Sequence, residues 1–215
     1  MRIKERAVKI VEALEREYPA AICSLEYERP YELLLATRLS AQCTDARVNI
    51  VTKELFQKYP TLQSIAEAEI AVIEAIIKPC GLYKTKARDL VNICRELIAR
   101  FNGEVPDTME ALLSLSGVGR KTANLVLGDV YHKPAVVCDT HCIRITNLMG
   151  LTTTKDPLKC ELELKKLLPP EKSNDFCHRM VLHGRAVCRA RAPQCGICCV
   201  QSLCTYGIKA LKPIR

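Results

Sequence analysis

Apolar residues recur at intervals of three and four along most of this chain, and that helical period is its strongest constraint on the fold. The longest stripe spans residues 87–101 and ends at Asn102 and Gly103, a pair that favours the end of a helix. Pro30 opens another stripe, and Thr44 or Asp45 stands where the side chain of an N-cap is expected. The sequence therefore predicts an all-α protein.

One short run departs from this period. Ala135–Cys138 has the residue types of a strand, but a single run this short has no partner to pair with, so we expect a linker. No repeat of fixed period is present, which excludes a solenoid. Further helices are expected over residues 108–115, 120–130, 140–149, 156–168 and 173–188.

The linker region also contains the best candidate for a domain boundary, at His132-Lys133-Pro134. A chain of 215 residues can bury one large core or two small ones. We predict one domain over residues 22–133 and a second that combines residues 1–21 with residues 134–215. The first helix is assigned to the second domain because the C-terminal half otherwise lacks a helix to cover its core.

Charge narrows the choice of partner. Lys and Arg number 32 against 24 Asp and Glu, and the formal charge of +8 favours nucleic acid over an anionic membrane surface. No apolar run approaches the roughly 20 residues that span a bilayer. The first residues mix acids and bases and lack the apolar segment of a secretory signal, so we expect a cytoplasmic protein with no targeting segment.

Five of the thirteen cysteines lie within residues 188–204. The expected compartment is reducing, which argues against a disulfide framework. Four of the five, Cys188, Cys195, Cys198 and Cys204, are predicted to hold one metal centre, because short loops cost little closure entropy. Zinc sites usually pair two short knuckles, whereas only one is present here, so the spacing favours an iron–sulfur cluster and leaves zinc as the alternative.

Two segments have residue types that contact phosphate. Arg189 and Arg191 lie in the first gap of the cysteine spacing, where a basic loop suits a phosphate and a solvated surface loop is the alternative. Residues 115–122 join two helical stripes through Gly117-Val118-Gly119, and this spacing matches neither a dinucleotide fingerprint nor a P-loop. The glycines allow a tight hairpin whose backbone N–H groups approach a phosphate closely, and a plain helix connection is the alternative.

Two ionisable residues follow the hairpin. Lys121 lies in the first turn of the next helix, beside Arg120, where its charged form is disfavoured. That environment suits a nucleophile for Schiff-base chemistry, and a surface lysine that contacts phosphate is the alternative. Asp139 opens a later helix, either as its N-cap or as a carboxylate that takes protons and stabilises a cationic sugar.

Together these elements resemble the endonuclease III family of DNA glycosylases over residues 5–205. The resemblance implies two helical domains: a six-helix barrel domain with a helix-hairpin-helix motif, and an iron–sulfur cluster domain, with a DNA-binding cleft between them. Besides the cysteine spacing, the matching stretches are Leu39-Ser40-Ala41-Gln42-Cys43-Thr44-Asp45, Gly81-Leu82-Tyr83, Ser116-Gly117-Val118-Gly119-Arg120-Lys121-Thr122-Ala123, Val137-Cys138-Asp139-Thr140-His141 and Leu182-His183-Gly184-Arg185.

The resemblance also implies an activity. It is the removal of oxidised pyrimidines such as thymine glycol from duplex DNA, with cleavage 3′ to the abasic site by β-elimination. Lys121 matches the lysine that attacks C1′ of the flipped nucleotide, and Asp139 matches the catalytic carboxylate. Gln42 matches a residue that fills the gap left by the flipped base, and Leu82 matches a wedge on the opposite strand. The four cysteines match the ligands of a [4Fe-4S] cluster with a structural role. The residues assigned to DNA contact are Gln42, Leu82, Gly117, Val118, Gly119, Arg120, Lys121, Arg189 and Arg191.

Two alternatives stay open at this point. A monofunctional glycosylase of the same fold, acting on mismatched or alkylated bases, would not use Lys121 as a nucleophile. A non-enzymatic iron–sulfur DNA-binding protein would use it only to contact phosphate. The chain departs from the family pattern at Ser116, where many members carry proline, and it adds thiols at Cys43, Cys138 and Cys199 whose oxidation is left open. We expect a monomer of prokaryotic type that acts on nucleoid DNA.

Overall fold

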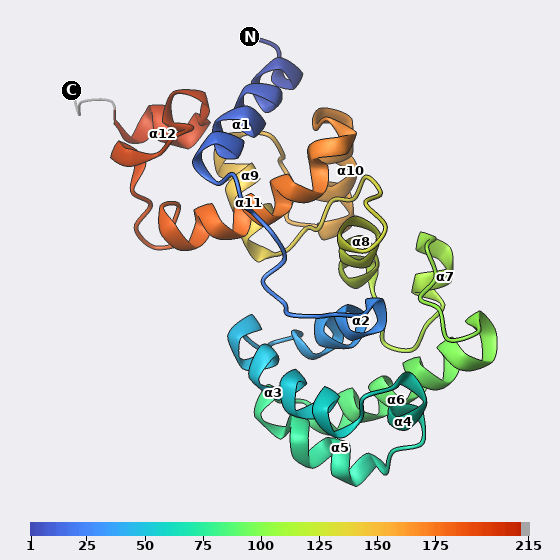
Figure 1. The fold of residues 1–215 in the computed structure, drawn as a ribbon. Coiled ribbons are helices and arrows are strands. Elements are labelled where there is room, and N and C mark those ends of the chain that lie inside the picture. The colour runs from blue at the N-terminus through green and yellow to red at the C-terminus, as the bar shows by residue number, and fades with distance from the viewer. Residues whose placement is uncertain (212–215) are drawn as a thin grey trace. The chain divides into compact units, whose positions relative to one another are not determined.

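The computed structural model describes residues 1–211 and consists of α-helices with four short 3-10 helices between them (Figure 1). None of residues 1–211 lies in a β-strand, so the predicted all-α class is confirmed. Residues 135–138 connect two helices, as expected of a linker, and three of the four are buried. Within the same described part of the chain, no helix has the length and hydrophobicity needed to cross a membrane.

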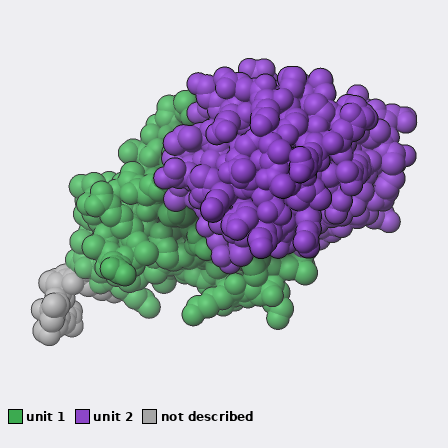
Figure 2. Space-filling model, turned by 90° about the horizontal axis from the view of Figure 1, so that it is seen from below, with its two compact units in different colours: residues 1–22, 132–215 green, residues 23–131 purple. Residues whose placement is uncertain are grey.

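The chain folds into two compact units, which are coloured separately in Figure 2. Unit 2 is the continuous segment Cys23–Tyr131, whereas unit 1 combines Met1–Ile22 with the chain from His132 onward. The first limit falls one residue, and the second two residues, from the domain boundaries expected from the sequence. Each unit has its own buried core.

Helix α6 is the longest helix of unit 2 and packs against α2, α4 and α5 of that unit. Its buried face carries the stripe predicted over residues 87–101, and it ends at Asn102, whose φ of 53° is left-handed. The helices of this unit are α2 (Pro30–Leu39), α3 (Asp45–Lys58), α4 (Leu62–Ala66), α5 (Ile70–Ile77), η1 (Lys78–Cys80), α6 (Tyr83–Phe101), α7 (Met109–Leu113) and α8 (Arg120–Asp129).

Helix α3 begins as predicted, because the Thr44 hydroxyl accepts the N–H of Arg47 at 3.4 Å. The short helices α4 and α7 begin in the same way, with a threonine hydroxyl that accepts the N–H three residues further on. These caps satisfy backbone donors that have no partner inside the helix. Helix starts in unit 2 are therefore set largely by local sequence.

In unit 1, helix α1 packs against α10 and α11. The guanidinium of Arg6 on α1 donates to the carbonyl oxygens of Gly150 at 2.7 Å and Leu203 at 3.0 Å. The first helix is thereby joined to the cysteine-containing segment near the other end of the chain. The helices of this unit are α1 (Ile3–Glu17), α9 (Thr140–Met149), α10 (Pro157–Leu167), η2 (Pro170–Lys172), α11 (Ser173–Ala186), η3 (Cys195–Ile197), η4 (Gln201–Leu203) and α12 (Thr205–Ala210).

Helix α11 ends at Ala186, two residues before the end expected from the sequence. The chain turns there because the N–H groups of Val187 and Cys188 both donate to the carbonyl of His183, at 2.9 and 2.8 Å. The first cysteine of the predicted metal centre consequently lies in the loop after the helix and not on the helix itself.

Candidate nucleic-acid interface and cysteine pocket

The glycine-containing turn forms a tight hairpin between α7 and α8 of unit 2. Gly117 has a φ of 68°, a left-handed conformation that favours glycine. A Cβ atom at this position would lie 2.7 Å from Oδ2 of Asp89 and 2.8 Å from Nε of Arg38. Val118 is buried, and Gly119 is the N-cap of α8. Backbone conformation and available space therefore both require glycine at position 117.

Two carboxylates of α6 support this hairpin. Asp89 accepts from Nε of Arg38 at 2.7 Å, and the pair lies directly against Gly117. Glu96 accepts from both the N–H of Ser116 at 3.0 Å and its hydroxyl at 2.5 Å. Proline at position 116 would provide neither donor. Sequence reasoning missed both carboxylates, although their spacing of seven residues on one predicted helix puts them on the same face.

Lys121 is exposed in the first turn of α8, immediately after the hairpin. Its neighbour Arg120 is half-buried in the same turn. Gly119, the N-cap of α8, has no side chain to cap the first N–H groups of this helix. The hairpin thus combines a positive helix end with two basic side chains.

Gln42 and Leu82 are exposed residues of unit 2 that lie outside the hairpin: Gln42 is three residues before the start of α3, and Leu82 is the N-cap of α6. Both have left-handed backbone conformations, with φ of 56° at Gln42 and 49° at Leu82. Residues other than glycine rarely adopt this conformation, and it persists where the surrounding structure imposes it. The side chain of Leu82 is also 55% exposed.

Asp139 is the N-cap of α9 in unit 1, and its Oδ1 accepts the N–H of Cys142 at 2.7 Å. Among the described residues, no hydrogen bond engages its other carboxylate oxygen. Hydrogen bonds from the thiols of Cys142 and Cys160 lower the pKa of the neighbouring Cys138 to about 5. Asp139 belongs to unit 1, whereas Lys121 belongs to unit 2.

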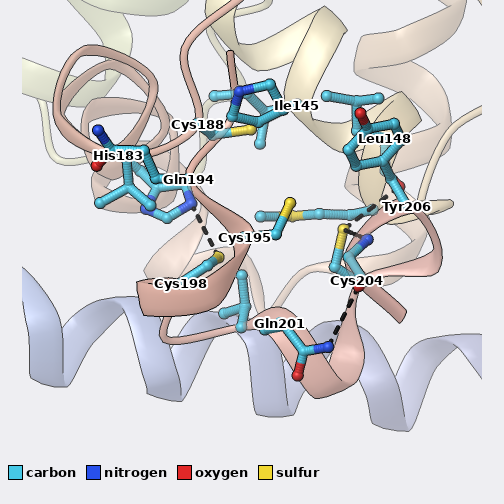
Figure 3. Close-up of a pocket in the computed structure, with 15 residues that line it drawn as sticks. Ile145, Leu148, His183, Cys188, Gln194, Cys195, Cys198, Gln201, Cys204 and Tyr206 are labelled. Atoms are coloured by element: carbon cyan, nitrogen blue, oxygen red, sulfur yellow. Dashed lines mark hydrogen bonds between the residues drawn. The ribbon is translucent and has the colours of Figure 1, made fainter. Parts of the chain in front are cut away.

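The four cysteines predicted as ligands line a single pocket in unit 1, and Figure 3 shows their side chains arranged around it. The fifth thiol of this segment, Cys199, is exposed and is not among the lining residues. Arg189 and Arg191 are exposed in the loop between the first two pocket cysteines. The apolar part of the lining consists of Ile145, Leu148, Met149, Val187, Pro193 and Val200.

Two side chains to which the sequence assigned no role contact the pocket thiols. Nε2 of His183 lies 3.5 Å from Sγ of Cys198, and its Nδ1 lies 3.1 Å from the hydroxyl of Tyr18. Arg144 donates to the carbonyl of Cys188 at 2.7 Å and lies 3.8 Å from its Sγ. Burial raises the pKa of the Cys188 thiol, and Arg144 opposes that shift. The only sequence feature that pointed to either side chain was the position of His183 in one of the stretches that resemble the endonuclease III family.

The chemistry of the pocket suits a soft metal centre. Its donors are four thiols from one short segment, and sulfur ligands of this kind select iron–sulfur clusters or zinc. Within residues 1–211, no three His, Cys, Asp or Glu side chains are close enough together to hold one metal ion. By their donor type, the four thiols fit a sulfur-ligated metal centre.

Comparison with known proteins gives the family. Residues 35–170 match the model of the HhH-GPD superfamily of base excision DNA repair proteins. The chain is 46% identical to an endonuclease III of Synechocystis sp., over 94% of this chain and 92% of that protein. It is 41% identical to an endonuclease III of Haemophilus influenzae, over 96% of this chain and 98% of that protein. The chain belongs to the endonuclease III family.

The solved structures agree with this assignment. A trapped endonuclease III–DNA covalent intermediate matches 99% of this chain and 100% of its own, with a TM-score of 0.91 and 40% identity. As a member of the endonuclease III family, the protein is a DNA-binding enzyme of base excision repair, with DNA glycosylase and lyase activity. The monofunctional and non-enzymatic alternatives are not favoured by these relatives.

Proposed function

We propose that this protein removes oxidised pyrimidines such as thymine glycol from duplex DNA and then cuts the strand 3′ to the abasic site. The observation that carries the proposal is the exposed amine of Lys121 in the first turn of α8, directly after a hairpin that requires glycine. That arrangement brings a nucleophile close to a segment suited to bind the DNA backbone.

The hairpin is proposed to bind phosphate. Gly117, Val118 and Gly119 present backbone N–H groups next to the positive end of α8, where an anion is favoured. The exposed Gly119 has no atom within 4 Å of the place its Cβ would take, so a phosphate can approach closely. Arg120 and, in the cysteine loop, Arg189 and Arg191 add positive charge.

Lys121 is the proposed nucleophile. Its free amine attacks C1′ of the flipped nucleotide, the bond from C1′ to the base breaks, and the base leaves with the bonding electrons. The nitrogen loses one proton and the departing base takes one, which keeps the step balanced. Opening of the sugar yields a Schiff base, and loss of a C2′ proton then breaks the bond from C3′ to oxygen.

Asp139 is the proposed proton carrier for these steps. One of its oxygens caps α9 and so fixes the side chain, which leaves the other oxygen to accept protons. Its negative charge would also stabilise the positive charge that develops on the sugar. Gln42 and Leu82 are proposed to occupy the space left by the flipped base, which offsets the cost of removing that base from the stack.

We also propose that Cys188, Cys195, Cys198 and Cys204 hold a [4Fe-4S] cluster. The support is their common pocket and their sulfur donors. When bound, the cluster would supply a rigid anchor for the loop with Arg189 and Arg191, and no chemical step. We further propose that the protein is of prokaryotic type and acts as a monomer on nucleoid DNA.

Borohydride trapping tests the enzymatic part of the proposal. A duplex with one thymine glycol and a duplex with one abasic site are each incubated with the protein and borohydride, which reduces a Schiff base to a stable bond. Wild-type protein should give a covalent band on both duplexes, and Lys121→Gln should give none while still binding DNA. Lys53→Gln is the matched control, because Lys53 is an exposed lysine on α3 of the same unit.

The possible results separate the alternatives. A band on the abasic duplex alone would retain the lyase and reject thymine glycol as the substrate. A band that persists in Lys121→Gln would reject Lys121 as the nucleophile. Intact DNA binding without a band on either duplex would favour a monofunctional glycosylase or a non-enzymatic binding protein.

A further inference from the structure

Lys86 of α6 has a fully buried side chain, with 0% of its surface exposed. Its Nζ donates to three backbone carbonyl oxygens, those of Leu39 at 2.8 Å, Ala41 at 2.7 Å and Cys80 at 2.8 Å. A lysine ammonium has three N–H donors and no acceptor, so these bonds satisfy it completely. Burial of a charge is costly unless such partners are present, and the arrangement therefore calls for an explanation.

The three carbonyls belong to the two segments that carry Gln42 and Leu82. The carbonyl of Ala41 is part of the peptide bond that leads into Gln42, and the carbonyl of Cys80 lies two residues before Leu82. In addition, the backbone N–H of Lys86 donates to the carbonyl of Leu82 at 3.0 Å. Lys86 thus bonds the backbone at Leu82 itself, shortly before Leu82 at Cys80, and directly before Gln42.

The conformations of these segments need such support. Gln42 and Leu82 both have positive φ values, which a non-glycine residue keeps only where its surroundings impose them. The same two segments also bring two thiols together, since burial and, after it, the neighbouring Cys43 raise the pKa of Cys80 to about 11. Neither Gln42 nor Leu82 is buried, so packing of their own side chains does not fix them.

We propose that Lys86 is a positioning residue that holds the Gln42 and Leu82 segments in one fixed arrangement, so that both side chains enter the DNA together when a base is flipped. This inference rests on the proposed function, because it takes from it the role of the two side chains. Lys86 itself touches neither substrate nor reacting atoms. It acts through the backbone of the two segments that present Gln42 and Leu82.

Lys86→Met tests the proposal, because methionine is also long and unbranched but has no N–H donor. Arg95→Met is the matched control. Arg95 lies on the same helix and its Nε donates to the carbonyl of Ala66 at 2.9 Å, so the control loses a cation-to-carbonyl bond away from both segments. Hydrogen exchange should accelerate at least about tenfold over residues 40–43 and 80–83 together in Lys86→Met, and at neither segment in Arg95→Met.

The enzymatic readout is single-turnover cleavage of two duplexes. In Lys86→Met, excision from a thymine glycol duplex should fall about a hundredfold, the size of effect expected when a group is misplaced by about 1 Å. Strand cleavage at a preformed abasic site should fall less than about fivefold, because no base has to be removed from the stack. A general loss of folded protein would lower both rates equally.

A double-mutant comparison adds a second check. Gln42→Ala and Leu82→Ala should each slow excision in the wild-type background but add little in the Lys86→Met background, since the two side chains are already misplaced there. If Lys86→Met does not fold, Lys86→Gln replaces it, because the amide keeps two N–H donors on a shorter side chain.

Three results would overturn the inference: unchanged exchange at either segment, equal loss of both cleavage rates, or additive effects in the double mutants. A wild-type protein that excises no base lesion would instead overturn the proposed function. The exchange measurement does not depend on that activity, so the two failures are distinguishable.

Discussion

The two units support the exposed residues that are proposed to contact DNA in different ways. In unit 2, charged side chains of α6 meet short hydrogen-bond partners from the same unit, as Lys86 does with three carbonyls and Glu96 with Ser116. In unit 1, the pocket thiols have partners at the longer distances typical of sulfur, from 3.3 Å between the N–H of Gly207 and Sγ of Cys204 to 3.8 Å between Arg144 and Sγ of Cys188.

This difference has a physical consequence. Strong internal hydrogen bonds hold a loop in place from the moment the unit folds, because their partners are part of the chain. Thiols are weak donors and acceptors, so they order a loop mainly through a metal centre. Unit 2 should therefore be ordered without a metal centre, whereas the order of the cysteine segment in unit 1 should depend on the proposed cluster.

The largest effect is expected from Cys198→Ser. It should remove nearly all bound iron, abolish the visible absorbance and destabilise unit 1 by more than about 3 kcal/mol, because metal binding is coupled to folding of the segment. Iron analysis and limited proteolysis of residues 188–204 measure this, and hydrogen exchange over residues 40–43 should stay unchanged. Altered exchange in that part of unit 2 would break the comparison.

Cys199→Ser is the matched control for that experiment. Cys199 is adjacent in sequence but exposed and outside the pocket lining, so its substitution should leave the iron content intact. Four irons per wild-type chain would support the cluster. One zinc per chain, or full iron retention in Cys198→Ser, would reject it.

A smaller effect is expected from Gly117→Ala in unit 2. The substitution places a side chain at φ 68° and a Cβ within 2.9 Å of the Arg38–Asp89 pair. Together these should lower the free energy of unfolding of unit 2 by about 2–3 kcal/mol, measured by urea denaturation. Gly119→Ala should cost less than about 1 kcal/mol, because its φ is −101° and nothing lies within 4 Å. Equal losses in the free energy of unfolding for the two variants would show that the Arg38–Asp89 pair moves easily to accommodate a Cβ atom at position 117.

The smallest effect is expected from Ser116→Ala, which removes the hydroxyl bond to Glu96 and keeps the backbone one. The free energy of unfolding should fall by about 1 kcal/mol, the usual net value of one intramolecular hydrogen bond. A double-mutant cycle with Glu96→Ala isolates the interaction. Strictly additive losses would mean that Ser116 and Glu96 do not support each other.

Much of this fold follows from local sequence. The helical period predicted α6 and its end at Asn102, and a helix start was predicted at Thr44 or Asp45, because both features depend on residues within a few positions. The glycine hairpin and the four-cysteine set were recognisable for the same reason, since spacing along a short segment determines which backbone or thiol groups can meet. The predicted ends of helices were less accurate, as α11 shows, because the turn after a helix is closed by backbone hydrogen bonds that no residue type indicates.

Local sequence specifies the helical class, the hairpin and the set of residues whose side chains can take part in binding or chemistry. Tertiary structure alone decided how those residues are held. Lys86 is one more polar residue in an amphipathic helix until the fold brings the carbonyls of Leu39 and Ala41, 47 and 45 positions away, to its Nζ. Backbone carbonyls are the same in every residue type, so no sequence pattern marks the ones that will bind a buried charge. Only the packing of α6 against the end of α2 makes this lysine a support for two exposed side chains.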